Sequence, residues 1–228
     1  MTLINCDLGE CLVPDPDEQI MPLINMANIA CGGHVGNETS IRKTMRLAKE
    51  HNVTIGAHPS YQDQTNFGRI SHDLESEELY ACLKEQLDYF TNLCEQEECK
   101  LTYIKPHGAL YHDMMQKPEV LDVICKLIKH INPELSLVVQ AGLYQQELAN
   151  KSTETNITFL YEAFADRGYR DTQMIPRTES GALLMEPVEI IEQYDSFVEK
   201  PSFPVDTICF HSDHSPSVLA LQLLKDRR

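Results

Sequence analysis

The stretch LTYIKPHGALYH, residues 101–112, contains a pattern that recurs along this chain of 228 residues. It begins with the run Leu101–Lys105, rich in apolar and β-branched residues, and turns polar at Pro106 and His107. A residue that precedes proline avoids the helical region, so Lys105 is held extended at the end of the run. The stretch therefore predicts a short strand with polar side chains at its carboxyl end.

Six other short runs are rich in apolar and β-branched residues, and most are followed by a helical pattern. They are Leu3–Cys6, Ala27–Cys31, Val53–Ala57, Leu135–Gln140, Ile157–Tyr161 and Thr207–Phe210. Their apolar character is nearly continuous, which is typical of parallel strands that are covered on both faces. We therefore predict seven parallel strands.

Helix signals lie between these runs. The predicted helices are one capped by Asn37, one that opens at Ser76, one over Pro118–Ile131, one over Leu143–Asn150, one around Val188–Tyr194, and a last one with Ser215 as N-cap and Pro216 as first helical residue. The alternation of strands and helices predicts right-handed βαβ units and an α/β fold. Seven units without a linker favour a single domain over residues 1–228, built as a closed or nearly closed barrel rather than an open doubly wound sheet.

The charge balance and the missing motifs exclude several classes of function. The 35 acidic and 19 basic residues give a net charge of −16, which disfavours binding to nucleic-acid phosphates or to an anionic membrane surface. The chain has no P-loop, no G-x-G-x-x-G fingerprint and no G-x-S-x-G elbow. Neither a recognisable nucleotide cradle nor a nucleophilic serine of that type is therefore expected.

The cysteines and the N-terminal residues indicate a cytoplasmic protein. The eight cysteines include no C-x-x-C pair and mostly lie in apolar runs, so we expect free thiols in a reducing compartment. The first ten residues lack the charged and apolar regions of a signal peptide, and no run approaches the roughly 20 apolar residues of a membrane span.

Polar side chains that can take part in acid/base or binding chemistry follow almost every predicted strand. They are, in chain order, Asn5, Asp7, Glu10, His34, His58, Lys105, His107, Gln140, Glu162, Asp166, His211, Asp213 and His214. Each alone has an ordinary explanation, such as a turn cap, or a pairing of Asp166 with Arg167. Because the carboxyl ends of parallel strands share one rim, where active sites of α/β folds lie, we expect this set to converge into one functional site.

Glycines surround one of these residues. Gly32, Gly33 and Gly36 flank His34 just before the Asn37 cap. This arrangement would place the N–H groups of a helix N-terminus beside the predicted site, which suits anions. A tight turn from strand to helix would need the same glycines.

Three further residues can be functional or structural. Arg69 and Arg177 lie in predicted loops, where each can bind a carboxylate or phosphate with its fork of N–H groups or can simply be exposed. Cys31 can be a nucleophile beside His34 or, as is commoner, a buried thiol at a strand end.

A divalent metal ion is a further possibility at the rim. Carboxylate and imidazole groups bind such ions, and four strand-end residues could together hold one: Asp7, His34, His58 and His211. Their spacing includes no local motif such as H-E-x-x-H, so this hypothesis depends on the predicted convergence alone.

Several motifs in order along the chain are similar to those of one known family. They are NCDLGE (5–10), NIACGGHVGN (28–37), GAHPSYQD with NFGR (56–69), YIKPHGALYH (103–112), EAFADRGY (162–169), PRTESGA (176–182) and ICFHSD (208–213). With these motifs over nearly its whole length, the chain resembles the LamB/YcsF family. The resemblance implies a TIM-like (β/α) barrel with about seven parallel strands, of the glycoside hydrolase/deacetylase type.

The resemblance also implies a reaction and partners. It points to the role of the A-type subunit of an ATP-dependent 5-oxoprolinase, a hydrolase that opens the cyclic amide 5-oxoproline to L-glutamate while ATP is hydrolysed to ADP and phosphate. The implied partners are two other subunits, of the B and C type. ATP is then a co-substrate, and because this chain lacks a phosphate cradle we expect the partner subunits to do much of the ATP work.

The motifs carry over a set of site residues. Those expected to be catalytic are Asp7, His34, His58, Lys105 and His107, and those expected to bind substrate are Glu10, Arg69, Glu162, Asp166, Arg177, His211 and Asp213. Asp7 or His107 would deprotonate water, and Lys105 with Arg69 would neutralise a developing oxyanion or phosphate. His34 and His58 would be a second acid/base pair or metal ligands.

Departures from the family pattern keep two other functions open. The short stretch CLVPDPDEQ follows Glu10 in place of a glycine-containing stretch, Gly33 stands where relatives have Phe, Asn37 where they have Asp, and Ser212 where they have Gly. The alternatives are a metal-dependent deacetylase or hydrolase acting on a sugar or amide without ATP, and a non-catalytic barrel subunit.

Overall fold

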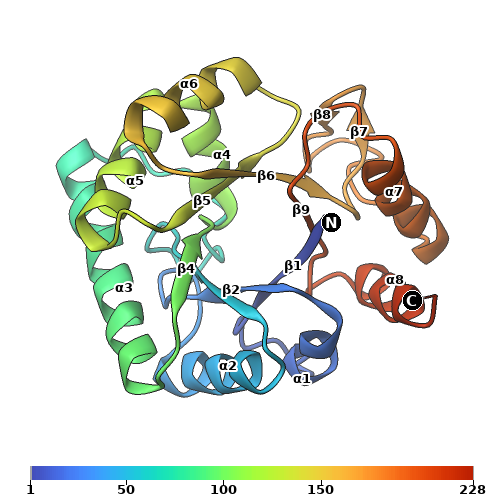
Figure 1. Cartoon of the computed structure of the whole chain (residues 1–228), viewed down its shortest axis with the longest axis horizontal. Helices are drawn as coiled ribbons and strands as arrows, with labels where there is room; N and C mark the ends of the chain where they lie inside the picture. The colour runs from blue at the N-terminus through green and yellow to red at the C-terminus, as the bar shows by residue number, and fades with distance from the viewer. Residues whose placement is uncertain (1, 228) are drawn as a thin grey trace.

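A closed barrel of parallel strands forms the centre of the protein, whose computed structural model describes residues 2–227 (Figure 1). In hydrogen-bonded order the strands are β1 (Leu3–Leu8), β2 (Met26–Ala30), β3 (Thr54–His58), β4 (Leu101–Ile104), β5 (Ser136–Gln140), β6 (Phe159–Phe164) and β9 (Thr207–Cys209), which pairs with β1. Each predicted run supplies one strand, and the predicted α/β barrel of seven parallel strands is confirmed.

Helices surround this barrel, as Figure 1 shows. They are α1 (Asp17–Ile20) with the 3-10 turn η1 (Met21–Leu23), α2 (Glu38–Glu50), α3 (Ser76–Gln96), α4 (Gly108–Gln116), α5 (Pro118–Ile131), α6 (Gln145–Thr155), α7 (Pro187–Glu199) and α8 (Ser215–Lys225). The bounds of α5 agree with the prediction at both ends. The prediction that Ser215 is the N-cap of α8 is wrong. His214 is the N-cap, and Ser215 begins the helix just before Pro216.

Five elements have no counterpart in the sequence-based prediction. They are α1, η1, α4 and the two strands of a small antiparallel hairpin, β7 (Tyr169–Arg170) and β8 (Gln173–Met174). α1 is a single turn and the two hairpin strands have two residues each, too short for a periodic pattern to develop. α4 begins with glycine, the weakest helix former after proline, directly after the polar end of β4.

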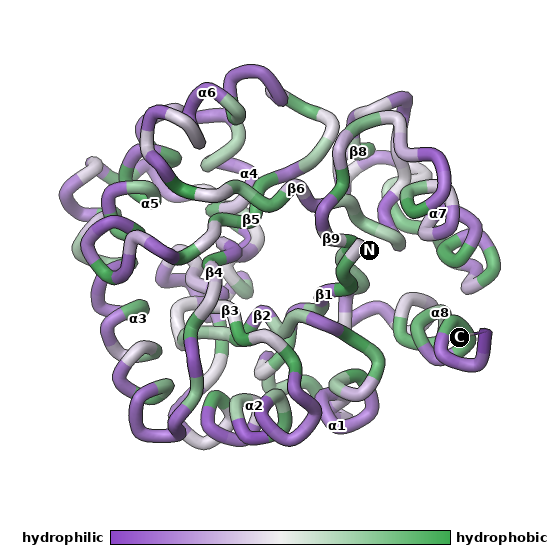
Figure 2. The backbone as a smooth tube through the Cα atoms, viewed as in Figure 1, coloured by the Kyte–Doolittle hydropathy of each residue, from purple (hydrophilic) through white to green (hydrophobic). Residues whose placement is uncertain are grey.

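Apolar side chains fill two regions. The larger core lies between the strands and the helices, and a small second cluster of Met26, Tyr103, Val138 and Leu160 lies apart from it. In Figure 2 the outer turns of α3 are largely hydrophilic, in keeping with a helix that presents one apolar face to the strands. No helix within residues 2–227 is long and apolar enough to cross a membrane.

Inside the barrel, a network of buried polar side chains begins beside the small apolar cluster. The Tyr103 hydroxyl donates to Asn28 Oδ1 at 2.7 Å, and Asn28 Nδ2 donates to both Asn5 Oδ1 and Asp7 Oδ1 at 2.7 Å. Asn5 Nδ2 donates to the Thr207 hydroxyl at 2.8 Å. Side chains at alternate positions of a strand face the same side of the sheet, so the pairs Asn5/Asp7 and Tyr103/Lys105 carry this network toward the carboxyl ends of β1 and β4.

The close approach of β3 and β4 requires glycine at position 56. The register between these strands shifts between Ile55 and Gly56, and Gly56 then pairs with Tyr103. A Cβ atom at Gly56 would lie 2.1 Å from Tyr103 Cε2 and 2.2 Å from Cζ. Because the ring is buried and its hydroxyl is held by Asn28, it has no free space into which it can move.

Gly56→Ala should therefore destabilise the protein by about 3 kcal/mol, the upper range for overpacking a core. Urea unfolding followed by circular dichroism measures this change. In a Tyr103→Leu background the same Gly56→Ala change should cost little, since the clashing ring is gone. An equal cost in both backgrounds would mean that the ring is not what excludes the methyl group.

Candidate active site

A cavity of about 440 Å³ opens at the carboxyl ends of the strands. Of the residues predicted for the site, those that line it are Asp7, Glu10, His58, Arg69, Lys105, His107, Arg177, His211 and Asp213. The other three, His34, Glu162 and Asp166, are buried and contact residues of this lining. The predicted convergence is confirmed for these twelve residues and for Gln140, which also lines the cavity, whereas His214 donates to the carbonyl oxygen of Leu184 and is not part of the lining. The catalytic and binding roles stay predictions.

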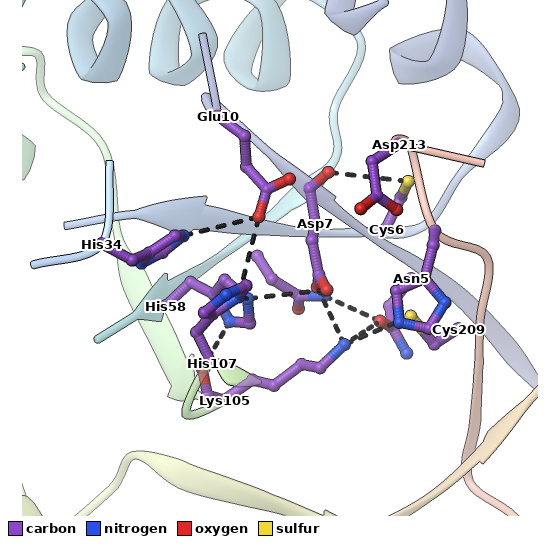
Figure 3. Close-up of polar contacts among 12 residues, drawn as sticks. Asn5, Cys6, Asp7, Glu10, His34, His58, Lys105, His107, Cys209 and Asp213 are labelled. Carbon is purple, nitrogen blue, oxygen red and sulfur yellow. Dashed lines mark hydrogen bonds and ion pairs between the residues drawn. The ribbon is translucent and has the colours of Figure 1, made fainter. Parts of the chain in front are cut away.

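Lys105 occupies the centre of the site. Its ammonium nitrogen lies 2.8 Å from Asp7 Oδ1, 2.9 Å from Glu162 Oε1 and 3.2 Å from Cys209 Sγ. The contact with Glu162 is an ion pair without hydrogen-bond geometry, since neither carboxylate oxygen of Glu162 has a hydrogen bond within the described residues. Lys105 is thus a buried cation between two buried carboxylates (Figure 3 shows its contact with Asp7).

This arrangement keeps both Lys105 and Asp7 charged. Burial acts to lower the pKa of Lys105, but the neighbouring charge of Asp7, together with that of Glu162, raises it well above its ordinary value. Burial acts to raise the pKa of Asp7, but His58 and Lys105 lower it well below its ordinary value. The cavity therefore has a fixed positive and a fixed negative charge side by side at its base.

Three histidines from successive strand ends form a cluster beside Asp7. His58 ends β3, His107 is the N-cap of α4, and His34 follows β2. His58 Nε2 lies 3.0 Å from His107 Nδ1 and 3.5 Å from Asp7 Oδ2. The rings of His34 and His107 are stacked, with centroids 3.7 Å apart, and the His58 ring is nearly perpendicular to both.

Glu10 joins this cluster from the loop after β1. Its Oε1 lies 3.4 Å from His34 Nε2 and 3.7 Å from His107 Nδ1 (Figure 3). Burial raises the pKa of Glu10 well above its ordinary value, and the charge of Asp7 adds to this effect. Burial also lowers the pKa of both His34 and His107. Burial thus favours the neutral forms of Glu10, His34 and His107.

Asp166, which is buried, and His211, which is partly buried, form a second pair at the cavity. Asp166 accepts hydrogen bonds from the backbone N–H and from Nδ1 of His211, at 3.1 Å and 2.8 Å. The alternative pairing of Asp166 with Arg167 does not occur, because the Arg167 guanidinium donates instead to the carbonyl oxygens of Ala182 and Ile175. Asp166 therefore positions His211 at the cavity.

This pair should make the free energy of unfolding depend on pH in the acid range. Burial acts to raise the pKa of Asp166, but His211 lowers it to about 2, below the unfolded value of about 3.9. The pair therefore stabilises the folded state above pH 4, by about 2 kcal/mol, and loses this contribution as the pH falls toward 2.

Urea unfolding of Asp166→Asn at several pH values tests this expectation. The difference from the parent protein should be largest near pH 7 and shrink between pH 4 and pH 2. Asp171→Asn, the same change at an exposed position, should stay within about 0.5 kcal/mol of the parent throughout. A pH-independent difference for Asp166→Asn would contradict the pairing.

At the mouth of the cavity lie two arginines that the sequence singled out. Arg69 contacts Asp213 Oδ2 at 2.6 Å, across 144 positions of sequence. Arg177 is exposed and lines the cavity. The rim therefore offers guanidinium groups to an anionic ligand.

At two positions around His34 the functional alternative is not supported, and for Cys31 the commoner alternative, a buried thiol, is confirmed. The N-terminal N–H groups of α2 are not free for an anion, because Asn37 Oδ1 accepts from the N–H groups of Thr39 and Ser40. Cys31 is not activated as a nucleophile, since it is buried and burial raises the pKa of its thiol. All eight cysteines are free thiols, as expected.

The structure divides the predicted metal set into two groups. Glu10, His34, His58 and His107 have donor atoms within 4.8 Å of one another, and a second group contains Asp7, Cys209 and His211. Asp7 and His211 therefore do not share a group with His34 and His58, whereas Glu10 and His107 do.

Sequence reasoning missed several residues of the site. Asn28, Tyr103 and Cys209 lie within apolar strands and contact the charged residues only because they face the barrel interior. A polar residue such as Asn28 inside an apolar run is the signal that could have identified one of them. Nothing in the sequence around Cys209 distinguishes it from the other buried cysteines.

The chain matches the model of the LamB/YcsF family over residues 3–227. It is 35% identical over 237 residues to the A-type subunit of 5-oxoprolinase from Staphylococcus aureus (strain bovine RF122 / ET3-1), covering 98% of this chain and 94% of that protein. Its fold superposes on the crystal structure of the lactam utilization protein from Thermus thermophilus with a TM-score of 0.88 and 30% identity, covering 99% and 96% of the two chains. A putative cellobiose-phosphate cleavage protein from Enterococcus faecalis V583, with a TM-score of 0.62 and 14% identity, is similar in fold alone.

The match thus extends over nearly the whole chain, and the motifs that resemble the family lie around the cavity. Residues from NCDLGE, NIACGGHVGN, GAHPSYQD and YIKPHGALYH form the cluster of Asp7, Glu10 and the three histidines with Lys105. Both the full-length match and this placement lead to one conclusion: the chain belongs to the LamB/YcsF family.

Proposed function

We propose that this chain is the A-type subunit of an ATP-dependent 5-oxoprolinase and opens the lactam ring of 5-oxoproline to give L-glutamate. The observation that carries the proposal is the buried Lys105 between Asp7 and Glu162 at the base of a cavity of about 440 Å³. Arg69 and Arg177 at the mouth suit the carboxylate of a small anionic substrate. Relatives named as this type of 5-oxoprolinase subunit and as lactam utilization protein support the assignment.

The chemistry of a lactam explains why ATP is needed. A five-membered cyclic amide is stabilised by resonance, so water attacks it slowly. Transfer of a phosphoryl group from ATP to the amide oxygen releases ADP and makes the ring carbon electrophilic. Water then adds to that carbon, the carbon–nitrogen bond breaks as nitrogen takes a proton, and a second water releases phosphate to leave the new carboxylate of glutamate.

Within this scheme Lys105 and Asp7, the charged pair at the bottom of the cavity, act on the ring carbon and its oxygen. Lys105 would stabilise negative charge on the former amide oxygen, where loss of one such donor costs about 3 kcal/mol. Asp7, which stays ionised, would orient the attacking water and receive its proton, a contribution of about 10² to 10⁴-fold. His107 is the other candidate base, since its pKa is lowered by burial.

Partner subunits of the B and C type would carry out much of the binding and hydrolysis of ATP. The chain has no phosphate-binding loop, and the N-terminal N–H groups of α2 are occupied by Asn37. The role as one component of a larger complex also agrees with the name of the related proteins.

Reconstitution tests the proposed function. The purified chain is mixed with candidate B and C subunits, 5-oxoproline and ATP, and glutamate, ADP and phosphate are measured. We expect glutamate only when all components are present, with one ADP formed for each glutamate. Glutamate formation without this chain would refute its part in ring opening.

One observation favours a second function, a metal-dependent hydrolase or deacetylase that needs no ATP: the cluster of Glu10 with three histidines. To test it, this chain alone is given an acetylated sugar or an amide without ATP. Release of acetate or amine would support that function over the first.

A further inference from the structure

We propose that Glu10, His34, His58 and His107 form a binding site for one divalent transition-metal ion of the zinc class. The site adjoins the cavity, because Glu10, His58 and His107 line it. This inference rests on the donor atoms of the four residues and does not depend on which reaction the protein catalyses.

Backbone contacts fix which ring nitrogens carry hydrogen. His58 Nδ1 lies 2.6 Å from the carbonyl oxygen of Lys105, and His107 Nε2 lies 2.9 Å from that of Phe67. A carbonyl oxygen only accepts, so both of these nitrogens must donate. The nitrogens that face each other at 3.0 Å, His58 Nε2 and His107 Nδ1, then both present lone pairs in the neutral rings. Two lone pairs at this distance repel unless a cation binds them.

His34 gives an independent indication of a missing partner. It is 1% exposed, and neither of its ring nitrogens has a hydrogen-bond partner within the described residues. A buried polar group without a partner destabilises the folded state, so native structures rarely retain one without a reason. Its Nε2 points toward Glu10, as the dashed line in Figure 3 shows.

The spacing of the donor atoms is that of a small coordination shell. Adjacent donors lie 3.0 Å, 3.4 Å and 3.7 Å apart, close to the edge of about 3.3 Å for a tetrahedron with metal–nitrogen bonds of about 2.05 Å. Because the rings of His34 and His107 are parallel, binding requires one of them to turn about its Cβ–Cγ bond. Three imidazoles and one carboxylate suit zinc and its neighbours better than magnesium or calcium.

The second group of possible ligands does not need an added ion. Asp7 and Cys209 already contact the Lys105 ammonium, at 2.8 Å and 3.2 Å. The protein thus supplies its own cation there. In the part of the chain that the structure describes, by contrast, no lysine or arginine side chain forms an ion pair or hydrogen bond with Glu10 or with the three histidines. A bound metal ion at the first group would supply a Lewis acid and an acidic water molecule next to the cavity.

Metal loading of the purified chain tests this proposal without reference to turnover. The protein is stripped with a chelator, dialysed against Zn²⁺ or Co²⁺, and freed of excess ion. We expect one equivalent of metal per chain by elemental analysis, a Co²⁺ visible spectrum typical of nitrogen and oxygen ligands, and a metal-dependent rise in melting temperature. Less than a tenth of an equivalent with no rise in melting temperature would refute the site.

Variants locate the ion within the cavity. His34→Gln and His58→Gln should each weaken metal binding about a hundredfold or more, since even outer-shell partners of a metal contribute up to that factor. His112→Gln is the matched control, because His112 lines the same cavity but lies outside the cluster. Circular dichroism of the metal-free proteins checks that each variant is folded.

Two results would overturn the assignment even if metal binds. One is an equal loss of affinity in His112→Gln, and the other is unchanged affinity in His34→Gln. If a variant does not fold, nitrogen NMR of the parent protein decides instead. The ring nitrogen signals of His34, His58 and His107 should all shift on addition of Zn²⁺. If a shared proton instead of a metal ion holds His58 and His107 together, the His34 signals stay unchanged on this addition, and the assignment is refuted.

Discussion

Lys105→Met should lower the free energy of unfolding by about 4 kcal/mol, because it leaves the buried carboxylates of Asp7 and Glu162 without their shared cation. Methionine has a similar length and fills the space, so packing accounts for little of the loss. The carboxylates can respond only by taking up protons, which costs free energy at neutral pH. Urea unfolding at pH 7 measures the change.

Two further variants make this prediction specific. Adding Glu162→Gln to Lys105→Met removes one of the unpaired charges and should recover part of the lost stability. Lys129→Met, the same change at an exposed position of α5, should stay within about 0.5 kcal/mol of the parent. If Lys105→Met has the same free energy of unfolding as the parent, the buried ion pairs do not stabilise the protein.

Asp7→Asn should reduce glutamate formation by the reconstituted complex at least a hundredfold while leaving the protein folded. The amide cannot accept a proton from water, and its NH₂ group would face Lys105 or Asn28 instead of accepting from them. A loss of this size lies within the range of general-base contributions. Stability should change less than in Lys105→Met, since Glu162 still neutralises Lys105.

The assay for Asp7→Asn compares glutamate formation with melting behaviour in the same preparations. Asp15→Asn is the matched control, since Asp15 is exposed and pairs with Lys43 away from the cavity. Near-normal turnover in Asp7→Asn would remove Asp7 from the mechanism. Loss of activity together with loss of cooperative melting would show a structural role only.

The arrangement of the site also shows which features local sequence can encode. Strand ends such as Lys105–Pro106 and His58–Pro59 are visible because proline restricts the preceding residue and the apolar run stops there. The parallel direction of the strands then places these ends on one rim. That rule was sufficient to bring Asp7, His58, Lys105 and His211 to one cavity.

The same reasoning could not assign partners within the rim. It paired Asp166 with Arg167 as one alternative, whereas His211, 45 positions away, is the actual partner. It placed Asp7 and His211 in one possible metal set with His34 and His58, whereas in the structure the donor atoms of His34 and His58 lie close to those of Glu10 and His107. Each of these contacts joins different strands or loops, so local spacing carries no information about it.

The amino-acid sequence by itself determined the number and direction of the barrel strands, most of the helices and the identity of the residues at the barrel mouth, because hydrophobic period and turn chemistry act over a few residues. Only the tertiary structure decided that Lys105 lies between Asp7 and Glu162, that Asn28 and Tyr103 support Asp7, and that four donor groups meet at His58. The reason is that closure of the barrel and the register shift at Gly56 set which side chains face inward at the same height, and both depend on how distant segments pack together.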